Sequence, residues 1–480
     1  MNSFLVNVQY LMYICRKFFK IMLKHIRLHR GLDIPLKGSA EPKVEKSIIS
    51  DVIALKPTDF KGVIPKLKVK EGDAVKAGSV VFVDKLHPEI AFSSPCSGTV
   101  KSIERGEKRK ILQILINADK TNDYLQFPAK DVFKASKEEL KQELLESGLW
   151  SAIKQRPYGT IANPADEPKA IFISAFNSAP LAGEINFVLK DEIDHLQIGV
   201  NVLNKFTKGG VYVGLNSKDF AASPLYKLKD VKHVAFDGMH PAGNVGIQIH
   251  HISPIGKGEI AWTIDPFFVA AIGKLFSKGV YDLSRLIAIT GERAENPCYV
   301  KTLPGMAIKE ISTFVSKKEA KISGQNVDIR YISGDVLSGE NVGLDGYLGF
   351  YHSQITLISE GNYFELLGWA KPIRPSKFSI SHSYCSWLSP SKKYNGDSNL
   401  NGGQRAFVVT GLYEKVLPMD IYPVYLLKAI LADDIDKMEQ LGIYEVVEED
   451  LALCEYVCPS KIDVQEIITK GINMMLKEMA

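Results

Sequence analysis

The sequence predicts a multidomain protein of mixed α/β and α+β class. At 480 residues the chain is too long for a single hydrophobic core, and its composition, with 45% hydrophobic and 24% charged residues, is ordinarily globular. Three patterns follow one another along the chain: short strands between glycine turns, strands that alternate with helices, and a helical end. We therefore expect a β domain, a parallel α/β domain, a small α+β domain and a C-terminal helical domain, in that order.

Charge, cysteine content and hydropathy exclude several classes of protein. Residues 1–30 carry six basic residues and no acid, so the rest of the chain is slightly acidic although the net charge is +4. Nucleic acid is not an expected partner, because its binding needs a dense basic face. Six scattered cysteines form no disulfide framework and fit a reducing cytosol. The apolar stretch 262–276 falls short of the ~18 residues that span a membrane, and we expect Asp265 and Pro266 to begin a buried helix there.

Residues 1–21 are set apart from the fold. Their apolar part precedes Arg16, Lys17 and Lys20, whereas a signal peptide carries its positive charge first. A membrane-surface helix with a basic end is one interpretation. We favour a start of translation at Met22, with residues 1–21 as a non-native or disordered extension.

Residues 22–125 form the N-terminal region. Between 63 and 105, short alternating segments are separated by glycine turns, and their order resembles the barrel-sandwich hybrid of lipoyl and biotinyl carrier domains. Those carriers modify a lysine at a hairpin tip, which would be Lys85 here. Lys85 is followed by the bulky Leu86, where lipoyl carriers have a small residue. We expect the hairpin to be scaffold only.

Strands alternate with helices between residues 126 and 285, which predicts a Rossmann-like α/β domain with a parallel sheet. A polar amphipathic helix is expected over 130–150. Buried strands are expected in the apolar runs 169–176, 197–203, 210–215 and 231–236, with helices around 181–194 and 220–228. Residues 286–375 then supply a strand pair, a helix and further strands, and residues 376–480 become helical, with one helix that stops at Gly442.

A glycine-rich segment and two adjacent histidines give no site. Gly243-x-x-Gly246 would suit a phosphate only before a helix, and the residues that follow, IQIHHI, alternate like a strand. In a strand, His250 and His251 would point to opposite faces and share no metal. We predict no phosphate site and no metal site here, and we assign no catalytic residue to the chain.

The last cysteines fit half of an iron–sulfur motif. Cys454 and Cys458 occupy the final two positions of C-x2-C-x2-C-x3-C-P. The spacing would place the other two thiolates at Leu451 and Glu448, which cannot complete a set of four. We therefore predict no cluster, and we expect the two cysteines to share one helical face as core residues.

Several ordered stretches together resemble the A subunits of the Na+-translocating NADH:quinone reductases, from about Met22 to the C-terminus. They are RGLDIPLKG (30–38), SPCSGTVKSIERGEKR (94–109), ESGLWSAIKQRPYGTI (146–161), DGMHPAG (237–243), SGDVLSG (333–339), YLGFYHSQ (347–354) and EEDLALCEYVCPSK (448–461). This family is itself similar to the C subunits of the Rnf complexes and to the flavoprotein subunit of complex I.

In those relatives an α/β domain holds FMN and NADH and is followed by a β-grasp, SLBB-like domain and a helical domain with cluster cysteines. The resemblance implies the same order here, with the β-grasp domain at 286–375 and the helical domain at 376–480. The flavin loop falls near 146–158, where Leu149 and Trp150 stand in place of glycine. Tyr422-Pro423 stands where a first cluster motif would end. The resemblance thus implies a scaffold that binds no cofactor of its own.

The resemblance also implies a function at the level of a complex. The complex reduces ubiquinone or menaquinone with NADH and exports Na+, using FMN, FAD, riboflavin and iron–sulfur or iron centres elsewhere in the assembly. The chain would be peripheral, on the cytoplasmic face of the bacterial inner membrane, docked onto the other subunits of the complex (B to F), above all the B subunit in the membrane, with a part in the quinone reaction. Two alternatives stay open: a free-standing flavoprotein of the Rnf type, and a carrier that uses Lys85. A flavin absorbance band would support the first, and an intact mass without an adduct would dispose of the second. A quinone titration followed by fluorescence of Trp150, Trp262, Trp369 and Trp387 would separate a purely structural subunit from one with a part in the quinone reaction.

Overall fold

The computed structural model describes residues 24–478, except for 317–319, 323–324, 364, 366, 369–373, 375 and 381–385. The predicted extension at 1–21 and the side chains of Cys15, Trp369 and Cys385 lie outside the described residues. No helix among the residues described combines the length and the apolar character that crossing a membrane requires.

Two small antiparallel sheets build the N-terminal part and share one hydrophobic core, in which Phe82 stacks on Phe92 with ring centroids 4.5 Å apart. The first sheet has the order β3 (Val52–Leu55), β9 (Ile111–Ala118), β8 (Gly98–Arg105), β5 (Ala74–Val75). The second has the order β4 (Pro65–Leu67), β6 (Val80–Asp84), β7 (Ala91–Ser93). The short strands between glycine turns are thus confirmed.

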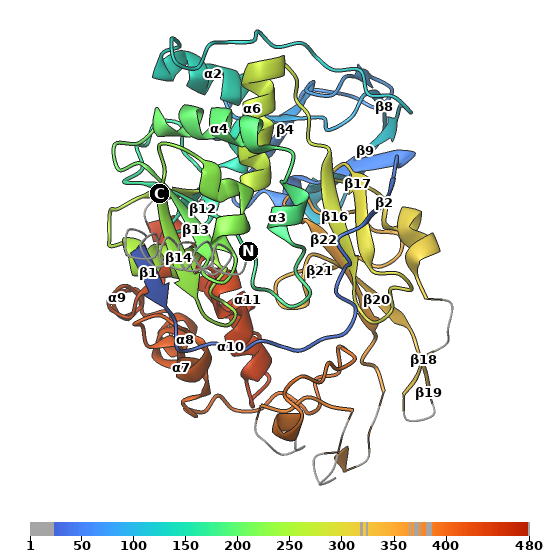
Figure 1. The fold of residues 1–480 in the computed structure, drawn as a ribbon, viewed down its shortest axis with the longest axis vertical. Helices are drawn as coiled ribbons and strands as arrows, with labels where there is room; N and C mark the ends of the chain where they lie inside the picture. The colour runs from blue at the N-terminus through green and yellow to red at the C-terminus, as the bar shows by residue number, and fades with distance from the viewer. Residues whose placement is uncertain are drawn as a thin grey trace, which may run out of the picture.

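A seven-stranded sheet, called the central sheet, forms the α/β part of the molecule, on the left in Figure 1. Its order is β1 (Lys24–Arg27), β14 (Lys232–Asp237), β13 (Val211–Asn216), β12 (Ile171–Ser174), β15 (Ala261–Thr263), β10 (Lys154–Arg156), β11 (Thr160–Ile161). The first five strands in this order are parallel to one another. The last two, β10 and β11, are antiparallel to their neighbours.

Helices cover both faces of this sheet, and the side chains of β12 show which helices lie where. Ile171 and Ile173 share a core with α4 (Ile193–Asn204) and α6 (Pro266–Lys278), whereas Phe172 packs with α5 (Val245–Ile252) on the other face. Asp265 caps α6 by accepting a hydrogen bond from the Phe267 N–H, as predicted. The predicted amphipathic helix is α2 (Lys137–Ser147), which begins with a capping box of Ser136 and Glu139.

Two expected strands are helices in the structure. The apolar run 197–203 lies in α4, where residues four apart such as Leu196 and Val200 face the core. The segment after Gly246 lies in α5. A short apolar run does not by itself distinguish a buried helix from a strand. Helix α5 is buried on two sides, because Ile247 contacts the C-terminal helices and Ile249 contacts the sheet, so it has no polar face to reveal its period.

A six-stranded sheet follows the α/β part. Its order is β2 (Val44–Ser47), β17 (Cys298–Thr302), β16 (Arg285–Thr290), β22 (Gln354–Ser359), β20 (Ile329–Ser333), β21 (Glu340–Asn341). A short 3-10 helix (Ile308–Phe314) and the hairpin of β18 (Ala320–Ile322) and β19 (Gln325–Val327) complete this unit. Strands β1 and β2 come from the first described residues, so residues 24–47 add an edge strand to each of the two larger sheets before the chain enters the barrel.

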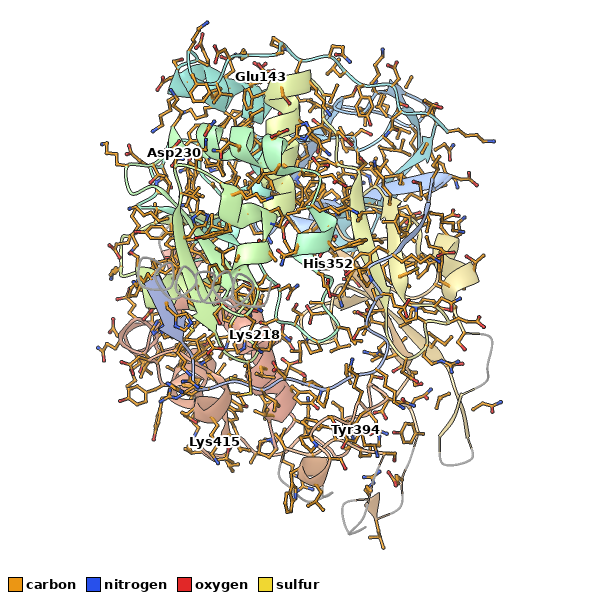
Figure 2. The ribbon with its side chains drawn as sticks, in the orientation of Figure 1. Glu143, Lys218, Asp230, His352, Tyr394 and Lys415 are labelled. Atoms are coloured by element: carbon orange, nitrogen blue, oxygen red, sulfur yellow. The ribbon has the colours of Figure 1, made fainter. Side chains whose placement is uncertain are left out.

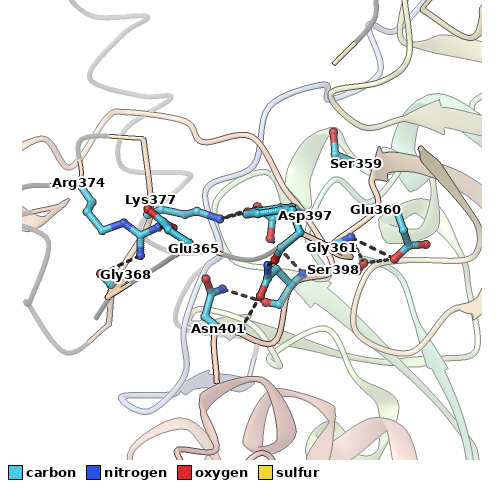
Figure 3. A network of polar contacts seen from close by, with 12 residues as sticks. Ser359, Glu360, Gly361, Glu365, Gly368, Arg374, Lys377, Asp397, Ser398 and Asn401 are labelled. Carbon is cyan, nitrogen blue, oxygen red and sulfur yellow. Dashed lines mark hydrogen bonds and ion pairs between the residues drawn. The ribbon is translucent and has the colours of Figure 1, made fainter. Parts of the chain in front are cut away.

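A polar network holds the chain beyond β22 (Figure 3). Lys377 Nζ lies 2.6 Å from Asp397 Oδ2, and the Ser398 hydroxyl donates to Glu360, which also pairs with Arg330 at 3.1 Å. These contacts join the end of the six-stranded sheet to the segment that leads into the C-terminal helices.

Five α-helices lie among the described residues of the C-terminal part, drawn in orange and red in Figure 1. They are α7 (Leu412–Val416), α8 (Pro423–Leu431), α9 (Ile435–Gln440), α10 (Ala452–Val457) and α11 (Val464–Glu478). Their core includes Val234 and Phe236 of β14, so the helical end packs directly on the central sheet. Gly442 adopts a φ of 98° just after α9, as the predicted helix stop requires.

Candidate functional site

A cavity of about 530 Å³ lies where β12 and β15 end. The chain goes from β12 to β13 on one side and later returns to β15 on the other side of β12, so this is the point where the strand order reverses. Ligands of open α/β sheets bind at such a point, outside the carboxyl ends of the strands. The cavity also reaches the six-stranded sheet and the acidic run before α10, which consists of residues 448–450. His352, which lines it, lies between the two large sheets in Figure 2.

Lys154 brings an unpaired ammonium group into the wall of this cavity. Its Nζ lies 3.9 Å from the centroid of the Tyr351 ring, and it has no ion-pair partner among the described residues. Burial lowers the pKa of Lys154. The Tyr351 hydroxyl donates to the Ser151 carbonyl at 2.6 Å, and burial raises the pKa of Tyr351. The lysine therefore has free N–H donors next to an aromatic face.

Arg285 supplies a second buried cation. Its Nη2 donates to the carbonyls of Phe350 at 2.8 Å and His352 at 2.6 Å, and its Nε is buried without a hydrogen-bond partner in the part of the chain described. Burial lowers the pKa of Arg285 to about 10. Asp265 lies close to both cations; burial raises the pKa of its carboxyl, and the charges of Arg285 and Lys154 act in the opposite direction.

His352 is a buried neutral group of the same wall. Its Nδ1 lies 2.8 Å from Ser333 Oγ, which also accepts the Gly349 N–H. Burial lowers the pKa of His352 to about 4, and the positive charges of Lys154 and Arg285 act in the same direction. The ring is therefore uncharged near neutral pH and can donate or accept one hydrogen bond.

The acidic run that replaces half of the iron–sulfur motif closes another side of the cavity. Glu448 pairs with Lys61 at 2.5 Å, and Glu449 and Asp450 both lie 2.9 Å from the guanidinium of Arg156. Lys61 belongs to the N-terminal part of the chain, and Arg156 belongs to β10. The run thus joins the helical end to the N-terminal part and to the central sheet.

Both cysteines are core residues, as predicted, but they do not share a helical face, because α10 ends before Cys458. Cys454 lies within α10 and Cys458 directly after it, and the two thiols are 0% and 1% exposed. Burial raises the pKa of Cys454. Leu451 is also fully buried. Among the residues that the structure describes, no group of three or more His, Cys, Asp or Glu side chains is arranged to hold a metal ion.

Gly243 and Gly246, the two glycines considered for a phosphate, serve close packing. A Cβ on Gly246 would lie 2.3 Å from Asp450 Oδ2, and one on Gly243 would lie 2.5 Å from the Ser178 nitrogen. The expectation that no helix follows was wrong, since α5 begins at Val245. The Asp450 carboxylate nevertheless packs against the first turn of α5. This contact explains the glycine at position 246, and no phosphate is needed to explain it.

His250 and His251 lie on α5 and not on a strand. Their rings are 5.0 Å apart and contact the C-terminal part, His250 Nδ1 at 2.6 Å from Glu445 Oε2 and His251 Nε2 at 2.7 Å from the Pro418 carbonyl. Both rings have protein partners, so the structural interpretation of these two residues holds although the predicted strand does not.

The bulky residues of the expected flavin loop lie beside the cavity and not in it. Leu149 and Trp150 are 1% and 0% exposed, and the Trp150 indole donates to the Ala162 carbonyl at 2.7 Å. Two residues further on, Ala152 reaches the cavity wall.

At the position where a first cluster motif would end, Tyr422 is 65% exposed, and Pro423 begins α8.

Lys85 is exposed in the connection between β6 and β7. The carboxylate of Asp84 holds this turn by accepting hydrogen bonds from the backbone N–H groups of Ile64 and Leu86, each at 3.2 Å. The lysine is accessible but does not line the cavity described above.

Lys154, Arg285 and His352 were not recognised as site residues from the sequence. Each is a basic residue within or beside an apolar strand, which is a weak signal because such residues are usually paired. They come from two sheets, Lys154 from β10 and Arg285 from β16, and only the packing of the two sheets brings them to one cavity.

The comparisons with known proteins agree with this architecture. Residues 26–119 match the NqrA N-terminal barrel-sandwich hybrid domain and residues 135–281 match the NqrA second alpha/beta domain, which confirms the barrel-sandwich hybrid and the α/β domain. The chain is similar to the A subunit of the Na(+)-translocating NADH-quinone reductase of Neisseria meningitidis serogroup C, with 37% identity over 94% of this chain and 100% of the relative. The corresponding proteins of Serratia proteamaculans (36% identity, 93% and 99%) and Rhodopirellula baltica (35% identity, 94% and 98%) are also similar.

Proposed function

The chain belongs to the NqrA family, the A subunits of the Na(+)-translocating NADH-quinone reductases, and we propose from this premise that it works as a peripheral part of such a complex. The observation that carries the proposal is the 37% identity along the full length of a relative with that name. The reaction belongs to the complex: electrons pass from NADH to quinone, and Na+ is translocated.

The finer fold assignments are part of this proposal. The strand order β14-β13-β12-β15 supports a Rossmann-like α/β domain. The mixed sheet over β16 to β22, with one short helix against it, supports an SLBB-like β-grasp domain at 286–375.

Docking onto a membrane-embedded partner on the cytoplasmic face is the proposed role of the C-terminal helices. Tyr422, Tyr425 and Leu431 of the α8 segment are 65%, 53% and 49% exposed, and exposed aromatic side chains are enriched in protein interfaces. Affinity purification of the tagged chain from native membranes should recover the B subunit. We expect Tyr425→Asp to reduce that recovery and Phe133→Asp, at a 76% exposed position outside the C-terminal helices, to leave it unchanged. If the native chain recovers no membrane-embedded partner, this role is refuted.

We place a contribution to the quinone reaction in the large cavity. A quinone needs an apolar cleft for its ring and donors for its carbonyl oxygens. Phe267, Phe268 and Tyr351 supply aromatic walls, and Lys154 and the free Nε of Arg285 supply donors.

A fluorescence titration tests this contact. Trp150 and Trp262 are buried with rings 5.4 Å apart, and Trp262 belongs to β15, the strand whose end lines the cavity. A short-chain quinone should quench their emission in the native chain and in Lys85→Gln at the same concentration. Lys154→Gln loses one hydrogen bond from a charged donor, so quenching of this variant should require about tenfold more quinone. Equal quenching in all three proteins would exclude the cavity as the quinone contact.

The absence of a bound cofactor is also a proposal. It is supported by Glu448 and Leu451 in place of two thiolates, and it predicts a colourless protein after anaerobic isolation. Stoichiometric iron and sulfide, or bound FMN, would instead favour the Rnf-type flavoprotein. An intact mass without a lipoyl or biotinyl adduct, after coexpression with the ligases, would dispose of a carrier function for Lys85.

A further inference from the structure

A second cavity, of about 230 Å³, adjoins the first at the carboxyl ends of β12 and β13. The two cavities share Phe176, Asn177, Gly183 and Ile185 in their walls. The quinone proposal makes no use of the smaller one, whose walls have a different chemistry.

Hydrogen-bond acceptors line the smaller cavity. The Asn186 side chain donates from Nδ2 to Asp219 Oδ2 at 2.9 Å, which directs the Nδ2 group to protein and leaves Oδ1 free. Asn186 Oδ1 and Ser223 Oγ are both buried and have no hydrogen-bond partner among the residues described, and Ser223 is only 2% exposed. Glu184 also lines this cavity. Buried polar atoms without partners are costly in a folded protein, so this wall is suited to a ligand that offers hydroxyl donors.

The position of the cavity narrows the class of ligand. In sequence the strands run β12, β13, β14, β15, and in the sheet they lie in the order β14-β13-β12-β15. In nucleotide-binding sheets of this order, an acidic residue just beyond the second strand accepts hydrogen bonds from the ribose hydroxyls. Asp219 lies just beyond Asn216, the last residue of β13, and both line the cavity.

We propose that the smaller cavity binds the ribose of a nucleoside. The vicinal 2′ and 3′ hydroxyls donate to Asp219 and to Asn186 Oδ1, and Ser223 Oγ completes the contact. The connection from β12 to α3 (Ile185–Val188) reads AFNSAPLAGE and contains no G-x-G-x-x-G, so the sugar and not a pyrophosphate is the group recognised. This inference does not depend on the quinone contact or on the assembly of the complex.

Calorimetric titration of the full-length chain with adenosine and with 2′,3′-dideoxyadenosine tests the proposal. Adenosine should bind, and the dideoxy compound, which leaves the acceptors unpaired, should bind at least about tenfold more weakly. Equal affinity for the two compounds, or no binding of adenosine, would overturn the proposal.

Three variants locate the binding. Asp219→Asn and Ser223→Ala should each weaken adenosine binding several-fold and reduce the difference between the two nucleosides. Asp230→Asn is the matched control, because Asp230 lies outside the cavity and asparagine tolerates its φ of 58° equally well. Thermal unfolding establishes that each variant is folded. If folded Ser223→Ala and Asp219→Asn both bind as the native chain does, the ribose site is excluded.

Discussion

The guanidinium of Arg156 lies 2.9 Å from the carboxylate of Asp450, and both side chains are almost completely buried. Burial alone would lower the pKa of Arg156, but the charges of Asp450 and Glu449 raise it. Asp450 also accepts the Val447 N–H at 3.1 Å. One ion pair thus connects a strand of the central sheet with the acidic run that precedes α10.

Replacing Arg156 should destabilise the whole chain. Arg156→Gln leaves the Asp450 carboxylate buried without its counter-charge, and breaking a buried pair in this way costs about 3–5 kcal/mol. Urea unfolding followed by far-ultraviolet circular dichroism measures the loss.

A surface pair gives the matched control for Arg156. Lys257 lies 2.8 Å from Glu439 but is 68% exposed, and pairs of this kind are weak. Lys257→Gln should therefore unfold at the native urea concentration. An Arg156→Gln variant as stable as Lys257→Gln would show that the buried pair contributes nothing.

Gly246 should not tolerate a methyl group, although alanine is the better helix former. The Cβ of Gly246→Ala would collide with the Asp450 carboxylate at 2.3 Å and displace it from Arg156. We expect a loss of about 1–3 kcal/mol, as for other overpacked sites. Gly403→Ala is the control, since a Cβ there meets nothing within 4 Å. Unfolding midpoints that agree for the two variants would contradict the contact between α5 and the acidic run.

Cys454 and Cys458 should be inert in the folded protein. Both are buried, and burial raises the pKa of Cys454, so its reactive thiolate is scarce. We expect iodoacetamide to leave both unmodified in buffer and to alkylate both in urea, as read by peptide mass spectrometry. Modification of either residue in buffer, with the circular dichroism spectrum unchanged, would show that this end of the chain opens.

The elements with local signals could be predicted from the sequence. Asp265-Pro266 marked the start of α6 because the cap and the fixed φ of proline act within one turn. The glycine-punctuated strands of the barrel were predicted for the same reason. Helix α5 was missed because it is buried on both sides, so hydrophobic period carried no information about it.

The candidate site could not be predicted in the same way. Lys154 comes from β10 of the central sheet, whereas Arg285 and His352 lie in and beside the six-stranded sheet, so they share a cavity only because the two sheets pack together. The edge strands β1 and β2 were likewise unforeseen: their pairing with β14 and β17 depends on contacts more than 200 residues away. The sequence showed Glu448 in place of a thiolate, but only the structure shows that this glutamate pairs with Lys61 and that the next two acids pair with Arg156.

His352 should make the folded state sensitive to mild acid. Its pKa is lowered to about 4 in the folded chain and is about 6.5 in an unfolded chain. Between these values the unfolded chain binds one more proton than the folded chain does, so stability falls as the pH drops from about 6.5 towards 4 and changes no further through this group below that. From pH 7 to pH 5 the loss amounts to about 2 kcal/mol.

The variant His352→Asn separates this contribution from that of other groups. It cannot take up the proton, so its free energy of unfolding should decrease less between pH 7 and pH 5 than that of the native chain, by about 2 kcal/mol. His29→Asn, at an exposed position outside the cavity, should keep the native pH dependence. Urea unfolding of the three proteins at both pH values gives the comparison. If His352→Asn loses as much stability as the native chain, the imidazole is not held neutral by the cavity, and its use there as an uncharged hydrogen-bonding group fails with it.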